Sequence, residues 1–391
     1  MDFDFDAVID RRRTNCTKWD MMERYFGASS ENDLAMWVAD MDFLPPPAVN
    51  ATLQKMIDHG IHGYFGDDTA YRSAIVNWMD QRHDWRVEPD AISTVNGLVH
   101  GIGLCLDAYT APDDEIIIFT PVYHAFSARI QACGRKVVEA PLVLRDGVFH
   151  LDLETLESRL SGRERMLIFC SPHNPGGRVW SVAELASIAH FCERHDLILL
   201  SDEVHHDLVF EGFSHTPMVN AAPKQIDRIV MLSAASKTFN LAGGETGQVI
   251  IPNADLRHKF EASNKAFGST PNRFGPMMST AAYAHGAPWL DALLRYLDGN
   301  RAAVEDGLNE IPGVSVMPMG ATYLSWIEFS GTGMNQDEIR ERVQNRAGVV
   351  CNYGPTFGTG GETCLRLNFA TPRSRVAEAI NRIQDAFSDL Q

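Results

Sequence analysis

Residues 233–244 read Ser-Ala-Ala-Ser-Lys-Thr-Phe-Asn-Leu-Ala-Gly-Gly, and the interpretation of the whole chain starts from them. They follow an apolar, β-branched run that ends at Leu232 and predicts a buried strand. After such a strand, the small residues place Lys237 in a tight, partly dry turn. Burial disfavours the charged form of an amine and lowers its pKa, and the neutral amine is a nucleophile. Most lysines after a strand lie on the surface, but this context favours a chemical role for Lys237.

The composition argues against several functional classes. The chain has 391 residues, 45% of them hydrophobic, which allows two or three domains with a large core. A net charge of −17 argues against nucleic acid or an anionic membrane as partners. No apolar run approaches the ~20 residues of a membrane helix, and the acidic start Met-Asp-Phe-Asp does not resemble a signal peptide.

The seven cysteines are scattered and form no Cys-x-x-Cys pair. This pattern indicates neither a disulfide framework nor a zinc ribbon, so we expect a protein of the reducing cytoplasm. His59 and His62 are three residues apart, but no acid or thiol stands at a complementary spacing. We therefore expect no metal site.

Strands and helices alternate from about residue 115 onward. Continuous apolar runs predict strands at 116–119, 165–170, 197–201, 229–232 and 248–251. Between two of them, Ser181 and Glu184 have the spacing of a capping box that starts a helix. This order predicts an α/β fold with a mostly parallel sheet covered on both faces. Ligands in such sheets bind at the carboxyl ends of the strands.

Functional side chains follow four of these strands, namely Tyr123, Asn174, Asp202 and Lys237. All three residue types suit a ligand with a flat ring. An aromatic side chain can stack on the ring, an aspartate can pair with a protonated nitrogen of the ring, and an asparagine can donate to a phenolate oxygen on it. Taken singly, Asp202 could cap a helix and Asn174 could belong to a turn. The spacings from 174 to 202 (28 residues) and from 202 to 237 (35 residues) each span one strand–helix unit. This regular spacing favours a shared site.

A possible anion site precedes these strands, at Gly97. A short β-prone run at 92–95 leads to this glycine and then to an apolar helical stretch. A glycine here lets backbone N–H groups at a helix N-terminus face an anion, which the helix dipole also favours. Many turns into buried helices contain glycine, so the pattern by itself is a weak phosphate signal.

The Ser-Lys-Thr-Phe-Asn motif, the spaced strand-end residues, Arg11-x-x-Thr-Asn and Trp37-Val-Ala-Asp-Met-Asp-Phe resemble one branch of a known superfamily. This is the cystathionine β-lyase and C–S lyase branch of the class I/II aminotransferases, which are fold-type I pyridoxal 5′-phosphate (PLP) enzymes. The resemblance covers essentially the whole chain and is densest from 172 to 242. It implies a large PLP-binding domain at 48–288 and a smaller α+β domain made from 1–47 and 289–391.

The resemblance also implies cofactor contacts. It makes Lys237 the catalytic Schiff-base lysine and places Tyr123, Asn174 and Asp202 around the ring. His205 stands where ordinary aminotransferases usually have a tyrosine. The remaining cofactor contacts are expected from residues of the turns and loops around the phosphate: Gly97, Leu98, Val99, Ser233, Ser236 and Tyr64. Tyr64 is expected to reach the site of the neighbouring subunit, so the resemblance implies a homodimer with shared active sites.

On the substrate side, Arg366 lies within the predicted strand Leu-Arg-Leu-Asn-Phe. A half-buried arginine in a strand usually has a carboxylate partner, which is either an acid of the protein or a ligand. The resemblance implies that the partner is the α-carboxylate of the substrate, held bidentately. It also places Trp37 and Asn352 on the substrate side.

The implied activity is β-elimination from cystathionine or another S-substituted cysteine, which gives a thiol, pyruvate and ammonia. A PLP-dependent aminotransferase is the alternative, and a regulatory protein that retains the fold is a third hypothesis. Glu245 stands eight residues after Lys237, where general aminotransferases often have an arginine that reaches the phosphate. No second arginine at a motif position can clamp a distal carboxylate, which weakens a dicarboxylate aminotransferase interpretation.

Overall fold

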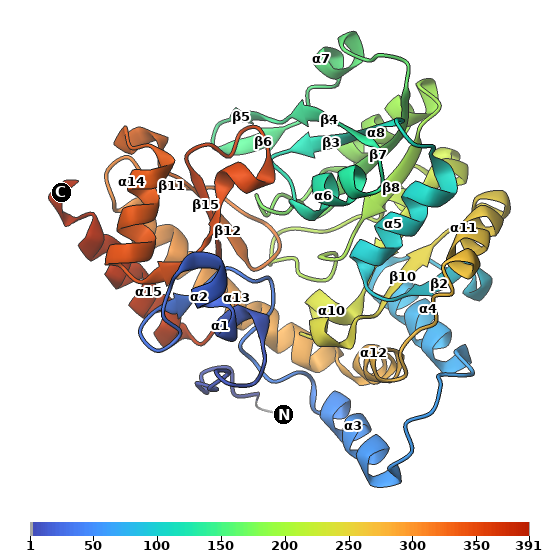
Figure 1. Cartoon of the computed structure of the whole chain (residues 1–391), viewed down its shortest axis with the longest axis horizontal. Coiled ribbons are helices and arrows are strands. Elements are labelled where there is room, and N and C mark those ends of the chain that lie inside the picture. The colour runs from blue at the N-terminus through green and yellow to red at the C-terminus, as the bar shows by residue number, and fades with distance from the viewer. Residues whose placement is uncertain (1–2, 391) are drawn as a thin grey trace.

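A seven-stranded sheet forms the larger part of the molecule in the computed structural model, which describes residues 3–390 (Figure 1). The strands lie in the order β2-β10-β9-β8-β7-β3-β4. Five of them, from β9 to β4, run parallel, whereas β10 is antiparallel to both β9 and β2. Their bounds are β2 (Ile92–Val95), β3 (Glu115–Thr120), β4 (Lys136–Pro141), β7 (Glu164–Cys170), β8 (Ile198–Asp202), β9 (Ile229–Ser233) and β10 (Gly247–Ile250). The predicted mixed, mostly parallel sheet is confirmed.

Alternate side chains of the central strands fill two separate cores. On β3, Ile116 and Ile118 pack into one core, while Ile117 and Phe119 pack into the other. The first core is covered by α5 (Leu98–Tyr109), α6 (Ala125–Ala132) and α11 (Ala254–Ala266). The second is covered by α4 (Thr69–His83), α8 (Val182–Arg194) and α12 (Phe274–His285). Because both faces are covered, these strands are apolar throughout, which is why their sequences show no alternation.

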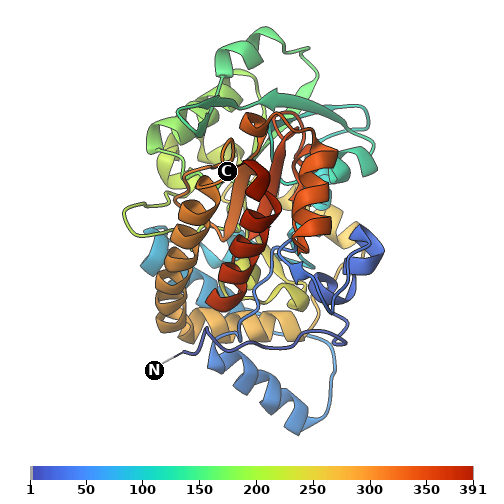
Figure 2. The ribbon, with the colours of Figure 1, turned by 90° about the vertical axis from the view of Figure 1, so that its left-hand side faces the viewer.

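A second sheet is built by the C-terminal part of the chain. It is antiparallel, in the order β11-β12-β15-β14. Its strands are β11 (Ser315–Val316), β12 (Leu324–Glu328), β14 (Asn352–Tyr353) and β15 (Cys364–Asn368). Figure 2 shows α13 (Ala287–Asn309), α14 (Gln336–Arg340) and α15 (Arg373–Ala386) side by side on one face of this layer, in orange and red. Near the other end of the chain, β1 (Leu34–Ala35) pairs with β13 (Val349–Val350), and this contact supports the proposed small domain made from both ends of the chain.

Local sequence signals explain several element boundaries. The capping box at the start of α8 is present, with Ser181 and Glu184 bonded reciprocally.

The remaining elements are short or peripheral: α1 (Thr17–Asp20), α2 (Met22–Phe26), α3 (Pro47–His59), β5 (Val143–Arg145), β6 (Val148–His150), α7 (Leu153–Ser158), α9 (Met218–Ala221) and α10 (Ala235–Thr238). Within residues 3–390, no helix is both long and apolar enough to cross a membrane.

Candidate active site

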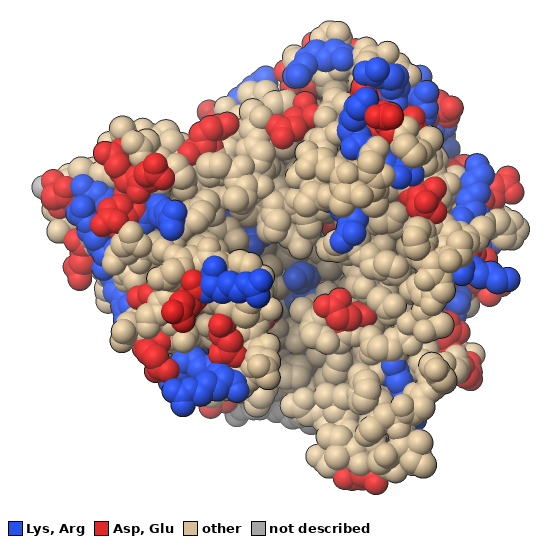
Figure 3. All heavy atoms as spheres, viewed as in Figure 1, with Lys and Arg blue, Asp and Glu red and all other residues tan. Residues whose placement is uncertain are grey.

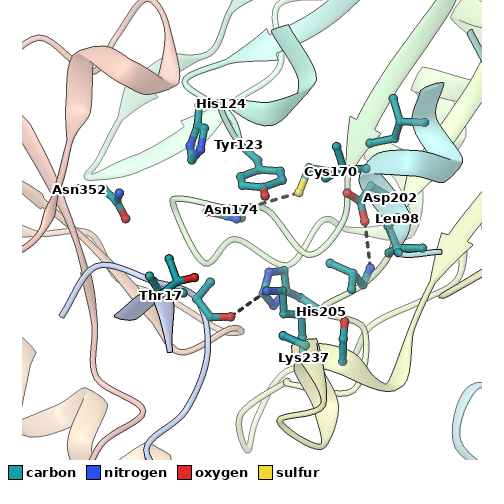
Figure 4. Close-up of a pocket in the computed structure, with 18 of the residues that line it drawn as sticks. Thr17, Leu98, Tyr123, His124, Cys170, Asn174, Asp202, His205, Lys237 and Asn352 are labelled. Carbon is teal, nitrogen blue, oxygen red and sulfur yellow. Dashed lines mark hydrogen bonds between the residues drawn. The ribbon is translucent and has the colours of Figure 1, made fainter. Parts of the chain in front are cut away.

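A cavity of about 380 Å³ lies where the carboxyl ends of the parallel strands meet the second sheet. Tyr123, Asn174, Asp202 and Lys237 all line it, and they follow or end β3, β7, β8 and β9 (Figure 4). These four strands are neighbours in the sheet, so residues distant in sequence meet at one edge. Figure 3 shows the same face as a central hollow with lysine and arginine atoms at its floor.

Lys237 lies in α10, directly after β9, and its Nζ donates to the carbonyl oxygen of Ala39 at 2.7 Å. Burial lowers the pKa of Lys237, although the carboxylate of Asp40 opposes the shift. The direction of this shift, toward the neutral amine, is the one that the strand-end position predicts. The acceptor, Ala39, belongs to the N-terminal segment at 37–42, and residues 37–39 of this segment also line the cavity.

Buried charges hold this N-terminal segment in place. Asp42 accepts hydrogen bonds from Lys18 at 3.1 Å and from Arg11 at 2.9 Å, and both the Lys18 and Asp42 side chains are fully buried. Burial alone would raise the pKa of Asp42, but these two cations lower it to about 2. The aspartate therefore stays ionised, and the segment is anchored beside Lys237.

Asp202 ends β8, and its carboxylate accepts one hydrogen bond within residues 3–390, from the Val204 N–H at 3.2 Å. Burial raises the pKa of Asp202 to about 7, although this hydrogen bond and Lys237 oppose the shift. Burial also holds the pKa of His205 well below its ordinary value, with Lys237 and Arg366 adding to the shift. The Nδ1 atom of His205 is buried without a hydrogen-bond partner in the described part of the chain. Both side chains thus retain bonding capacity toward the cavity, which they line.

The N-terminus of α5 forms one end of the cavity. Gly97 precedes the helix with φ +80°, a conformation that suits glycine, and Leu98 and Val99 begin the helix. All three residues line the cavity. The first N–H groups of an α-helix have no partner inside the helix, and its dipole is positive at this end. This end of the cavity can therefore hold an anion such as a phosphate.

Two of the predicted cofactor contacts lie outside the cavity lining. Ser236 lines it, but Ser233, at the end of β9, turns its hydroxyl into the protein, where Gln248 Nε2 donates to it at 3.2 Å. Tyr64 is 99% exposed and lines a separate groove. Within a single chain, the structure does not bring Ser233 or Tyr64 to the other site residues.

Arg366 is at the opposite end of the cavity, in the middle of β15, and is 2% exposed. Its guanidinium donates to Asn174 Oδ1 at 3.0 Å, to Asn352 Oδ1 at 2.6 Å and to the Trp37 carbonyl oxygen at 3.0 Å. None of the described residues offers it a carboxylate within 4.0 Å, so the protein does not supply the expected acidic partner. Burial lowers the pKa of Arg366 to about 10. A buried cation without an anion is costly, and a bound carboxylate would relieve that cost.

Several cavity residues were missed by reasoning from the sequence. His124 could have been found, since it directly follows Tyr123 after the same strand. Thr17 gave no signal in the sequence. Ala39 belongs to the quoted motif Trp37-Val-Ala-Asp-Met-Asp-Phe, but its contact with Lys237 through the backbone carbonyl was not predicted. Glu245 was noticed as a departure from the family pattern, but its position in the cavity was not predicted.

A network of buried histidines lies beside the site. His206 is 1% exposed and lies 3.2 Å from Asp207, which also bonds His83 at 2.7 Å. Similarly, His215 bonds Glu203 at 2.8 Å. The ligand atoms around a tetrahedral zinc ion are separated by roughly 3.3 Å. Most of the three distances between these histidines and acids are shorter, so they fit hydrogen bonds better than a metal centre. The network supports the chain from 202 to 207, which carries Asp202 and His205.

The fold and the site together define a class of protein. The chain belongs to the class I and II aminotransferase family, whose family model matches residues 33–383. Among curated relatives, it is 37% identical to the cystathionine β-lyase PatB of Bacillus subtilis over 98% of this chain and 100% of that protein. The predicted membership of the C–S lyase branch is confirmed by this similarity and by the solved structures of that branch.

Two solved structures illustrate the likeness. Cystalysin from Treponema denticola, which contains a PLP cofactor, superposes on this chain with a TM-score of 0.95 at 33% identity. The superposition covers 100% of both chains. The PLP-bound C–S lyase from Staphylococcus hominis superposes with a TM-score of 0.91 at 30% identity, covering 99% of this chain and 98% of that one.

Proposed function

We propose that this chain is a PLP-dependent carbon–sulfur β-lyase, which converts cystathionine or another S-substituted cysteine into a thiol, pyruvate and ammonia. The similarity to a cystathionine β-lyase and to C–S lyases supports this class of reaction. The observation that carries the proposal is the pairing of two groups in one cavity. Arg366 is a buried cation without a protein anion, and Lys237 is an amine whose pKa is lowered.

The cavity residues fit PLP. Asp202 has a buried carboxyl group with free bonding capacity, which suits the N–H of a pyridine ring. Gly97, Leu98 and Val99 offer a helix N-terminus to the phosphate, and Ser236 lies on the same cavity. Tyr123 can stack on the ring, and the Asn174 amide can donate to its phenolate oxygen. When bound, PLP supplies an electron sink that stabilises negative charge at the α-carbon of the substrate.

The residues of this chain then have distinct tasks. Arg366 binds the α-carboxylate, and its hydrogen bonds to Asn174 and Asn352 orient the guanidinium. The amine of Lys237 takes the proton from the α-carbon. The Cβ–S bond breaks, and its electron pair leaves with the sulfur, which receives a proton from the Lys237 ammonium. The remaining three-carbon enamine takes up water and becomes pyruvate and ammonia.

The aminotransferase alternative is less favoured by the lining of the cavity. An aminotransferase specific for dicarboxylic acids needs a second cation for the distal carboxylate. Within residues 3–390, the lysine and arginine side chains that line the cavity are those of Lys237 and Arg366, and both already have tasks. Elimination needs no such cation, because it requires only alignment of the Cβ–S bond and room for the thiol.

The test is a product assay with cystathionine. We expect pyruvate, ammonia and thiol in equal amounts without any added keto acid. Turnover that requires a keto acid would establish the aminotransferase alternative instead. Borohydride reduction followed by peptide mapping should find the cofactor on Lys237. Lys237→Ala should lose this label and nearly all turnover, whereas Lys259→Ala, on the exposed face of α11, should retain both.

We further propose that two chains form a dimer with shared sites, and that the protein works in the reducing cytoplasm. The loop after α3 supports the dimer, because Ile61 is 68% and Tyr64 99% exposed there, and the preceding Ile57 is 61% exposed. The seven unpaired cysteines support the reducing compartment. Mixing inactive Lys237→Ala chains with impaired Tyr64→Phe chains should restore some active sites. A fully active monomer in sedimentation, or recovery of the chain outside the cytoplasm, would contradict these proposals.

A further inference from the structure

A carboxylate lies at the end of the cavity where the phosphate is expected. Glu245 lines the cavity together with Gly97, Leu98 and Val99 at the N-terminus of α5. A Cβ atom built on Gly97 would lie 2.9 Å from Glu245 Oε2. The carboxylate oxygen is therefore in contact with the turn that would hold the phosphate.

The backbone holds Glu245 in this place despite strain. Its φ is +42°, in the left-handed region that side chains other than glycine seldom adopt. Asn272 Nδ2 donates to the carbonyl oxygens of Gly244 at 2.8 Å and Glu245 at 3.3 Å, and Thr246 Oγ1 donates to Gly244 at 3.0 Å. These bonds stabilise the strained turn and so direct the Glu245 side chain toward α5.

In the described part of the chain, the carboxylate of Glu245 has no cation at ion-pair distance. Within residues 3–390, no ion pair joins Glu245 to a lysine, arginine or histidine. The titratable and charged groups around it are Lys237 on the cavity side, and His62, Tyr64 and Arg273 along the adjoining groove. Arg273 donates to the Ile61 carbonyl oxygen at 2.8 Å. Burial lowers the pKa of Lys237, although Glu245 is one of the charges that oppose this shift. The helix N-terminus adds only about half a positive charge.

We propose that Glu245 and the phosphate of the cofactor share one proton, so that the phosphate ester binds as a monoanion hydrogen-bonded to a protonated carboxyl group. The inference rests on the proposed PLP function. A free phosphate monoester loses its second proton near pH 6, so it reaches the protein mainly as a dianion at pH 7.5. A carboxylate and a phosphate dianion placed side by side repel each other, which favours protonation of one of them when no cation pairs with either. Binding therefore takes up a proton from solution.

This proton uptake makes phosphate binding depend on pH. When one extra proton binds together with the ligand, the affinity falls about tenfold for each unit of rising pH. Glu245→Gln retains the shape of the side chain but has no ionisable group, so this part of the pH dependence is lost. Glu245→Gly removes the carboxylate as well and suits the positive φ, so it serves as a second variant that relieves strain.

The experiment uses pyridoxine 5′-phosphate, which lacks the aldehyde and forms no bond with Lys237. Calorimetry at pH 7.5 in buffers of different ionisation enthalpy measures the protons taken up, and ³¹P NMR reports the charge of the bound phosphate. Asp202 and the ring nitrogen also take up protons, but equally in wild type and variant. The readout is therefore the difference in proton uptake between the wild type and each variant. We expect about one proton fewer for both Glu245 variants. The ratio of wild-type to variant Kd should rise about tenfold from pH 7.5 to 8.5.

Glu261→Gln, an exposed acid on α11, is the matched control and should behave as wild type. Equal proton uptake in wild type and both Glu245 variants, or a dianionic ³¹P shift for wild type at pH 7.5, would overturn this inference alone. Failure of both pyridoxine 5′-phosphate and PLP to bind any of the proteins would overturn the proposed function together with it.

Discussion

The two ends of the cavity carry opposite charges, and neither charge is balanced within the described part of the chain. At one end, Arg366 is 2% exposed and is hydrogen-bonded to neutral oxygens. At the other end, Glu245 lies beside the N-terminus of α5, is exposed, and also lines the open groove that contains Tyr64. Burial separates the two cases, because water solvates the glutamate but not the arginine.

Burial determines how much can be concluded from an unbalanced charge. A buried, unpaired cation is costly to the folded protein, so its position indicates a ligand that supplies the missing anion. An exposed, unpaired anion costs little until a ligand displaces the water around it. We therefore expect large effects of substitution at the arginine end, intermediate effects at the buried acid between the ends, and small effects at the phosphate end.

The largest effect is expected for Arg366→Leu. It removes both hydrogen-bond donors to the substrate α-carboxylate, and kcat/KM for cystathionine should fall about 10⁴-fold, which corresponds to about 5.5 kcal/mol. Pyruvate release from cystathionine measures the change. Arg340 is an exposed arginine at the end of α14, and Arg340→Leu is the control. It should change kcat/KM by less than about twofold. If the Arg366 variant retained a tenth of the activity, the carboxylate would be bound elsewhere.

An intermediate effect concerns Asp202, a buried acid that differs from Glu245 in its solvent exposure. Burial raises the pKa of Asp202 to about 7, so the folded, cofactor-free protein keeps a proton that the unfolded chain loses near pH 4. This contribution to stability is complete below pH 4 and is lost as the pH rises to 7, with a total of about 4 kcal/mol.

Asp202→Asn should remove that part of the pH dependence. Urea unfolding of the cofactor-free protein between pH 5 and 8 provides the comparison. The wild type should lose more stability than the variant as the pH rises, by roughly 1.4 kcal/mol for each pH unit below 7. Parallel stability curves for the two proteins would show that Asp202 ionises normally in the folded state.

The smallest effect is expected for Gly97→Ala at the phosphate end. The alanine must adopt φ +80°, and its methyl group would lie 2.9 Å from Glu245 Oε2, so the turn or the glutamate has to shift. The affinity for pyridoxine 5′-phosphate should fall about tenfold, by the 1–2 kcal/mol typical of such strain. Gly134→Ala is a matched control, since Gly134 has φ +74° but no neighbour within 4 Å of the new atom. It should lose stability without losing affinity, and equal affinity losses in both variants would refute a local effect at Gly97.

Local sequence patterns were enough to predict which strand ends meet. Tyr123, Asn174, Asp202 and Lys237 each follow or end a continuous apolar run, and the rule for parallel sheets places such positions at one edge. Both steps depend on local patterns, namely strand length and hydrophobicity. For the same reason, the α/β fold and the capping box at Ser181 were predicted correctly.

Long-range packing sets which side chains turn into the cavity and which charges remain unpaired. Ser233 and Ser236 are three residues apart in one motif, yet the first points into the core because it ends a strand, while the second lines the cavity from the following turn. The Ala39 carbonyl oxygen and the carboxylate of Glu245 reach the site through long-range packing and a strained turn. Contacts of this kind depend on how distant segments pack and on solvent exposure, and neither is encoded in a local residue pattern.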